Sequence, residues 1–114
     1  AEAQQNDRIT KISQAGELLS EWGGLGPDPG SFQRIRAIDF DPADRLYVAD
    51  ACNHRIQIFD TSGNYIGGFG RPGSAPGELS YPYDVAVAPD GTIYVCEYGN
   101  HRVQRFSPAG DSLS

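Results

Sequence analysis

The 114-residue sequence has no run of lysine or arginine, no long hydrophobic stretch and only two cysteines. Fifteen acidic residues outnumber nine basic residues, so the net charge is −6. A surface that binds RNA or an anionic membrane is basic, and a membrane-spanning helix needs a run of roughly eighteen or more apolar residues. We therefore expect no nucleic acid partner and no membrane insertion. Two cysteines are too few for a disulfide framework or, alone, for a structural zinc site, and they leave the localisation open.

The sequence does contain a repeat with a period of 47 residues. The triplet Asn53-His54-Arg55 recurs as Asn100-His101-Arg102, and one step back from Asn53 reaches Asn6. Aromatic, glycine and proline positions keep this register: Tyr47 with Tyr94, Phe59 with Phe106, Gly63 with Gly110, Trp22-Gly23 with Phe69-Gly70, and Pro29-Gly30 with Pro76-Gly77. Periods of this size are typical of solenoids, propellers and arrays.

Each repeat reads as four short strands, A to D. Strand A is 37–41 or 84–88, strand B 45–49 or 92–96, strand C 8–12, 55–59 or 102–106, and strand D 18–22 or 65–69. Asp90-Gly91 is a strong hairpin signal between strands A and B. Apolar residues occupy both faces of the strands, as in a sheet that lies between two others. The expected fold class is all-β, with consecutive four-stranded antiparallel blades of a β-propeller that is incomplete in this chain.

The segments LYVADACNHRIQIFDTSGNYIGGFG and IYVCEYGNHRVQRFSPAG closely resemble NHL repeats, over about residues 6 to 114. Asp7 departs from the motif, because it replaces the histidine in the first copy. The resemblance implies a propeller, most often of about six blades, used mainly to bind proteins or, in some members, RNA; a few relatives are lyases or hydrolases. On this basis residues 6–31 supply strands C and D of a first blade, 32–78 a second blade and 79–114 an incomplete third blade.

The repeated polar residues could form a reactive cluster or hold the fold together. They are Asp50, Asn53, His54 and Arg55 in one copy and Glu97, Asn100, His101 and Arg102 in the next. A catalytic or metal site usually draws different residues from several blades, whereas these recur at the same positions. We expect acid–guanidinium pairs that tie strand B to strand C, or blade to blade, through charge-assisted hydrogen bonds. We expect asparagine to serve the turn, and we predict no catalytic residue, metal or cofactor.

The two cysteines occupy different positions of the repeat. Cys52 aligns with Gly99, and Cys96 aligns with Ala49. A disulfide needs Cα atoms within about 7 Å, which offset positions on separate sheets do not favour. We expect no disulfide, and Cys96 reads as a small buried hydrophobe.

Residues that do not repeat are the candidates for binding. Asp39 and Asp41 alternate along strand A, nearest the propeller axis, where the next copy has Ala86 and Ala88. The fold should not need these acids, so they could meet a cation or polar ligand in the channel; alternatively they are solvated. A second set lies just before strand A and could form a rim: Arg34, Arg36, Tyr81 and Tyr83. Arginine and tyrosine are favoured at interface hot spots, although ordinary loop residues are the alternative.

The chain is short for its fold. About six blades of this period need roughly 280 residues, and at least three repeats are usually needed for stability. Three chains with two repeats each would suffice, although both ends of the chain then supply strand C. The chain could instead be a segment of a larger protein, or a stable monomer. We expect a non-enzymatic protein-interaction or scaffold module, completed by self-association as a homo-oligomer or by a larger chain or assembly. The alternative is a segment of a propeller enzyme whose catalytic residues lie elsewhere.

Overall fold

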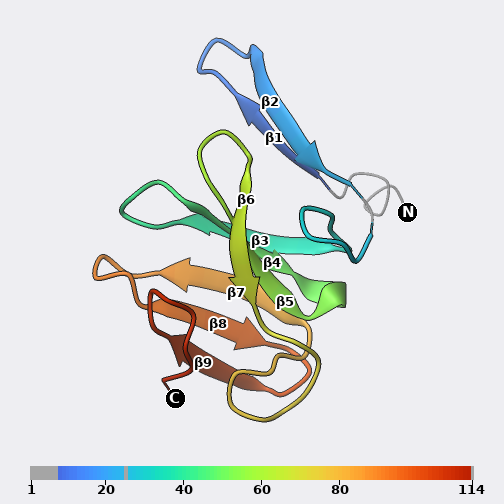
Figure 1. Cartoon of the computed structure of the whole chain (residues 1–114), viewed down its shortest axis with the longest axis vertical. Helices are drawn as coiled ribbons and strands as arrows, with labels where there is room; N and C mark the ends of the chain where they lie inside the picture. Colours follow the sequence, from blue (N-terminus) through green and yellow to red (C-terminus); the bar gives the residue numbers. More distant parts are fainter. Residues whose placement is uncertain (1–7, 25, 114) are drawn as a thin grey trace.

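The computed structural model describes residues 8–24 and 26–113, in which nine β-strands form three antiparallel sheets (Figure 1). The first sheet contains β1 (Arg8–Ile12) and β2 (Leu18–Gly23). The second is ordered β3 (Ile35–Phe40), β4 (Leu46–Asp50), β5 (Arg55–Phe59) and β6 (Tyr65–Phe69), with a short 3₁₀ turn at Ala51–Asn53. The third contains β7 (Pro82–Val87), β8 (Ile93–Glu97) and β9 (Arg102–Phe106). The predicted all-β class is confirmed.

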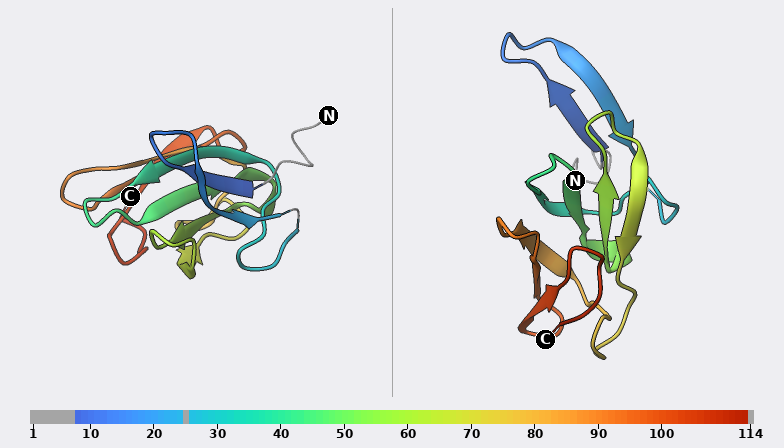
Figure 2. Two further views of the ribbon diagram at one scale, coloured as in Figure 1. Left: turned by 90° about the horizontal axis from the view of Figure 1, so that it is seen from above. Right: turned by 60° about the vertical axis from the view of Figure 1, so that its left-hand side comes forward.

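The three sheets follow one another along the long axis of the molecule (Figures 1 and 2). The innermost strands β3 and β7 lie side by side, so the second and third blades are in direct contact. In the part of the chain that the structure covers, no helix is long and apolar enough to cross a membrane. Asn6 and Asp7, the predicted start of the first repeat, lie outside the described residues.

The inner strand of each blade begins two residues earlier than the sequence predicts. β3 starts at Ile35 and β7 at Pro82. The register shifts between Ile35 and Ala37, and the same shift recurs in β7. The residue before each strand, Arg34 or Tyr81, has a positive φ of 64° or 50°. A bulge leaves an extra residue unpaired and bends the strand, and the alternation of apolar residues does not reveal it.

Two hydrophobic cores join the blades. Phe32, Leu46, Val48 and Phe59 form the first core, against which Ile9 and Trp22 of the first sheet pack. The second core lies between the second and third blades and consists of Tyr47, Ala49, Ile56, Leu79, Val85, Ile93, Val95 and Phe106. The second blade therefore buries apolar residues on both of its faces, which explains why its strands lack a simple polar side.

An aromatic ring of the outermost strand lies against a glycine of the following blade. A Cβ built on Gly63 would lie 2.6 Å from the Trp22 ring, and one on Gly110 would lie 3.3 Å from the Phe69 ring. Both glycines also have a positive φ, 89° and 91°. The glycine thus serves the turn and admits the ring of the neighbouring blade, which accounts for its recurrence in the sequence.

The third blade is open on the side away from the second blade. It has three strands among the described residues, and an isolated bridge between Phe106 and Ser112 begins a further pairing.

Both cysteines are free. The prediction that Cys96 is buried is wrong, because this side chain is half-buried on the open face, whereas its counterpart Ala49 is fully buried. Burial, followed by the nearby Asp84 carboxylate, raises the pKa of the Cys96 thiol.

Candidate functional site

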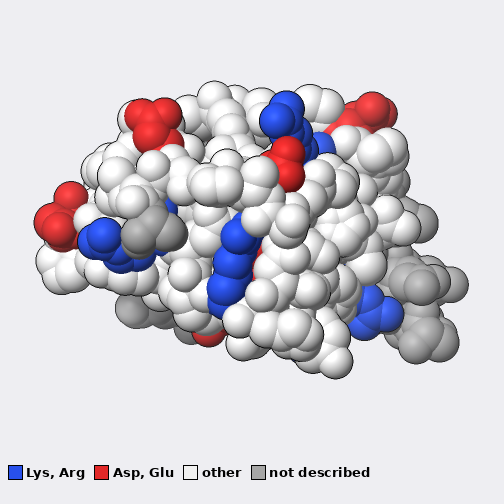
Figure 3. Space-filling model, turned by 90° about the horizontal axis from the view of Figure 1, so that it is seen from below, with Lys and Arg blue, Asp and Glu red and all other residues white. Residues whose placement is uncertain are grey.

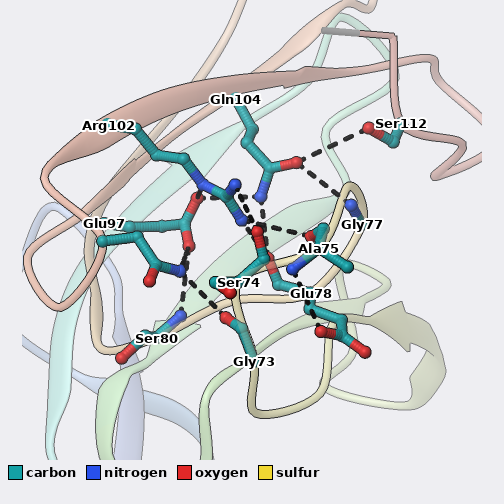
Figure 4. A network of polar contacts seen from close by, with 11 residues as sticks. Gly73, Ser74, Ala75, Gly77, Glu78, Ser80, Glu97, Arg102, Gln104 and Ser112 are labelled. Atoms are coloured by element: carbon teal, nitrogen blue, oxygen red, sulfur yellow. Dashed lines mark hydrogen bonds and ion pairs between the residues drawn. The ribbon is translucent and has the colours of Figure 1, made fainter.

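A buried carboxylate at the end of β8 gathers three side chains of the turn and of β9 (Figure 4). Glu97 Oε2 accepts hydrogen bonds from Arg102 Nε at 2.7 Å and from Gln104 Nε2 at 2.8 Å. Its other oxygen accepts one from Asn100 Nδ2 at 2.7 Å. The Glu97 side chain is inaccessible to solvent. We call Glu97, Asn100, Arg102 and Gln104 the polar clamp of the third blade.

The polar clamp holds the link that leads into the blade. Arg102 donates through Nη1 to the Ser74 carbonyl at 2.8 Å and through Nη2 to the Glu78 carbonyl at 2.9 Å. Asn100 Nδ2 donates to the Gly73 carbonyl at 2.9 Å. Each nitrogen of the Arg102 guanidinium thus donates to at least one protein oxygen, so the arrangement fixes a loop of otherwise irregular backbone.

The second blade carries the same clamp 47 residues earlier. Arg55 Nε donates to Asp50 Oδ2 at 2.8 Å, and Arg55 also donates to the carbonyls of Pro27, Asp28 and Ser31. Its four members are Asp50, Asn53, Arg55 and Gln57. The structure therefore contains the acid–guanidinium pairs that the sequence predicts. Sequence reasoning missed Gln57 and Gln104, which are buried; their shared register position was the signal.

Because of the polar clamp, the stability of the folded protein at acidic pH depends on the charge of the Glu97 carboxylate. Burial works to raise the pKa of this carboxyl, but hydrogen bonds from Arg102, Asn100, Gln104 and the Ser80 backbone outweigh it and hold the pKa below its ordinary value of 4.5. The unfolded chain therefore binds the proton more readily, and the stabilisation, complete above pH 4.5, is lost as the pH falls through the folded-state pKa.

We expect Glu97→Gln to flatten the acid slope of stability. The variant is less stable near neutral pH because the charge-assisted bonds weaken, and the difference from wild type shrinks as the pH falls below about 4.5. Urea unfolding followed by circular dichroism between neutral and acidic pH measures both curves. Parallel curves for the two proteins would contradict the assignment.

The two repeated histidines have different partners. His54 Nδ1 accepts a hydrogen bond from the backbone N–H of Tyr81 at 2.9 Å, which ties the second blade to the third. His101 is exposed and packs its ring against Tyr98 at a centroid distance of 5.9 Å. His54 thus helps to hold the second blade against the third. His101 lies on the open side of the third blade, where no described residue takes the place of Tyr81.

We expect His54→Asn to lower the free energy of unfolding by about 1 kcal/mol, because the half-buried Tyr81 N–H loses its acceptor. His101→Asn is the matched control: both histidines have a positive φ, 54° and 50°, which asparagine tolerates. Chemical denaturation of the two variants should show a loss only for His54→Asn. Equal losses in both would mean that the contact between blades contributes nothing.

The two axial acids serve the fold, which corrects the expectation that the fold does not need them. Asp39 Oδ2 accepts a hydrogen bond from the Val87 N–H of the next blade at 2.8 Å. Asp41 is 6 % exposed and follows β3 in the turn, where it accepts from Arg45 Nε at 2.7 Å and from the Tyr47 hydroxyl at 3.1 Å. Burial raises the pKa of Asp41, but the hydrogen bonds from Arg45 and Tyr47 outweigh it, so the net shift is downward. Both carboxylates therefore already accept hydrogen bonds from protein groups.

Three of the predicted rim residues meet in one hollow. A surface hollow of about 400 Å³ is lined by Arg36, Tyr81, Tyr83 and Tyr98; we call it the tyrosine hollow. The Tyr98 ring lies 6.1 Å from Tyr81 and 6.5 Å from Tyr83, at interplanar angles of 70° and 82°. This edge-to-face arrangement is favourable for aromatic rings. The hollow therefore combines edge-to-face aromatic rings with one guanidinium and has no acidic side chain in its lining.

The tyrosine hollow is not a repeated feature. Its tyrosines at 81, 83 and 98 stand where the second blade has Arg34, Arg36 and Ala51. Tyr98 is 66 % exposed, while Ala51 is buried. The backbone holds the turn in the same way in both blades, since Tyr98 N–H donates to the Tyr81 carbonyl as Ala51 N–H does to Arg34. Sequence reasoning missed Tyr98, although an aromatic residue at a turn position occupied by alanine in the other copy was a usable signal.

Other predicted elements lie outside this hollow. Arg34 precedes β3 and contributes its backbone carbonyl to the turn rather than lining the hollow. Within residues 8–24 and 26–113, no group of three or more histidine, cysteine or acidic side chains is placed to hold a metal ion.

Comparison with known proteins identifies the repeats. The family model described as NHL repeat matches residues 32–59 and 79–106. NHL repeat-containing protein 3 from Homo sapiens is 40 % identical over 55 residues, which is 48 % of this chain and 16 % of the relative. The chain thus matches only about a sixth of the length of that relative.

Solved structures share the fold over nearly the whole chain. Virginiamycin B lyase from Staphylococcus aureus superposes with a TM-score of 0.72 at 22 % identity, covering 96 % of this chain and 34 % of the lyase. A streptogramin B lyase gives a TM-score of 0.69 at 20 % identity, covering 94 % and 33 %. At this level of identity the likeness shows the fold alone, which is that of β-propeller blades.

Proposed function

Because this chain belongs to the NHL-repeat family, we propose that it is a protein-interaction or scaffold module whose contact surface includes the tyrosine hollow. The observation that carries the proposal is the cluster of Arg36, Tyr83 and the two-thirds exposed Tyr98. Tyrosine and arginine supply large contact area and hydrogen bonds at interface hot spots. These residues are not repeated between the blades, so they do not belong to the polar framework that the two copies share.

The chemistry of the hollow favours an acidic peptide segment as the partner. Arg36 offers a guanidinium without an acid in the lining, and the tyrosine rings offer both an apolar body and hydroxyl groups. A nucleic acid could also stack on such rings, but the net charge of −6 works against a polyanion.

The module is completed by further blades, from self-association or from a larger chain or assembly. The support is the apolar surface that two and a third repeats leave open, since blades of a repeat array bury their faces only against neighbours. The enzyme alternative rests on the names of the lyases in the comparison, and a shared fold below a quarter identity does not transfer an activity.

Selection of random peptides tests the proposed contact. We expect a displayed peptide library to yield binders that are rich in Asp or Glu, with affinity lost at least tenfold in Tyr98→Ala and in Arg36→Ala. Tyr65→Ala, at an exposed tyrosine of β6 outside the hollow, is the matched control and should bind as wild type. Peptides that bind Tyr98→Ala and Arg36→Ala as tightly as the wild type would overturn the proposal. Selective, salt-sensitive binding of single-stranded RNA would mean that the partner is a nucleic acid instead of a peptide.

A further inference from the structure

The third blade exposes a face that the second blade buries. Tyr94, Cys96 and Val103 share the outward face of β8 and β9, and Tyr94 and Val103 are 38 % and 58 % exposed. The equivalent residues of the second blade are buried against the third blade: Tyr47, Ala49 and Ile56, at 1 %, 0 % and 0 % exposure. Figure 3, which views the molecule from below and so from the third blade, shows a mainly uncharged surface with scattered charges. Three of the four positions on this face are thus apolar in both blades and covered in only one of them, while Arg105 stands where the second blade has Ile58.

The second blade is only half covered on its other face. Its outer part packs against Ile9 and Trp22 of the first sheet, but a cleft of about 450 Å³ opens over its inner part. Ile38 and Phe40 of β3 line this cleft and are 47 % and 56 % exposed. Their counterparts in the third blade, Val85 and Val87, pack in the core against the second blade.

By repeat position, these two open faces correspond to the two halves of the interface between the second and third blades. On the open face of the third blade, Tyr94 and Val103 stand at the repeat positions of Tyr47 and Ile56, which the second blade buries against the third. In the cleft of the second blade, Phe40 stands at the repeat position of Val87, which the third blade packs against the second. We propose that a second copy of the chain docks its third blade into the cleft beside β3, head to tail, so that copies join into a ring. The inference rests on the proposed completion of the propeller, and it names the partner.

Docking of a second copy requires that the hairpin β1–β2 leave its place on the second blade. β1 and β9 both occupy the third position of a blade, and β9 is fixed by Arg102 and Gln104 of the polar clamp. The hairpin β1–β2 is held by packing of Ile9 and Trp22 and by a hydrogen bond from Lys11 Nζ to the Thr61 carbonyl at 2.9 Å. The buried Trp22 indole N–H has no partner among the described residues, which is unfavourable. We therefore expect the hairpin to be displaced.

A head-to-tail contact has a distinctive signature, because each copy uses two different surfaces. We expect light scattering of the wild type to give a mass that rises with concentration from one chain of 12.3 kDa towards three chains. Phe40→Glu blocks the cleft and Val103→Glu blocks the open face, and each variant alone should remain a single chain. Both positions are more than half exposed, so neither change should prevent folding. Mixed in equal amounts, the two variants should form a complex of two chains and none larger.

Trp22 is the single tryptophan of the chain and reports the hairpin. Its emission should shift to longer wavelength as the wild type associates and should stay unchanged in Phe40→Glu. A single-chain mass at every concentration would overturn the proposal, as would association that survives both substitutions or proceeds without the Trp22 shift. Peptide binding at the tyrosine hollow is measured separately on Phe40→Glu, so failure of one proposal is distinguishable from failure of the other.

Discussion

Arg102→Met should lower the free energy of unfolding by about 3 kcal/mol, because it leaves the Glu97 carboxylate buried without its charged partner. The substitution also removes the donors to the Ser74 and Glu78 carbonyls, so the link into the third blade loses its anchor. Domains of this size are stable by roughly 5 to 15 kcal/mol, so the loss is a large fraction of the total. Urea unfolding followed by circular dichroism measures it.

Arg8→Met is the matched control, since Arg8 stands at the same repeat position as Arg102. Its guanidinium pairs with Glu21 at 2.9 Å, but the two side chains are 53 % and 38 % exposed. An ion pair in water contributes at most about 1 kcal/mol. A similar loss for both variants would mean that burial of the acid does not govern the effect.

Leu79→Ala is the second substitution from which we expect a large effect, about 3 kcal/mol of lost stability. Leu79 is fully buried in the core between the second and third blades, although it lies in a link without strand structure. Its side chain fills the space over Gly70, where an added Cβ would lie 2.5 Å from Leu79 Cδ1. Truncation therefore removes apolar contacts and leaves a cavity.

Leu113→Ala controls for the loss of leucine itself, because Leu113 is half exposed near the end of the described chain. We expect a change within about 0.5 kcal/mol there. Thermal melts and urea titrations of the two variants give the comparison. A Leu79→Ala protein as stable as wild type would show that the link does not belong to the core.

The period of 47 residues made most of the fold predictable. Because each strand recurs with its turn, the boundaries of β5, β6 and β9 agree with the sequence prediction to the residue. The bulges at the start of β3 and β7 were not predictable, since each follows a residue, Arg34 or Tyr81, that has an unusual positive φ. Arginine and tyrosine rarely adopt that conformation, and it persists only where the surrounding structure enforces it.

The site was predictable in part, for the same physical reason. Repetition separated structural side chains such as Arg55 from unrepeated ones such as Tyr83. The same reasoning gave the wrong role for Asp39 and Asp41. A contact between adjacent blades or one capped turn can require an acid in a single copy of the repeat. It also missed Tyr98, whose importance depends on the rings of Tyr81 and Tyr83 across the hollow. Distances across the sheet are not visible in a repeat alignment.

The central claim is that the repeated polar residues hold the fold while binding belongs to the tyrosine hollow. It is tested most directly by the affinity of one selected acidic peptide for Tyr98→Ala and for Asn100→Ala, with unfolding of each measured in parallel. We predict that Tyr98→Ala weakens binding at least tenfold at unchanged stability. Asn100→Ala should lower stability by about 1 kcal/mol and leave the affinity of the folded protein unchanged. The reverse pattern, with binding lost in Asn100→Ala and retained in Tyr98→Ala, would contradict the account.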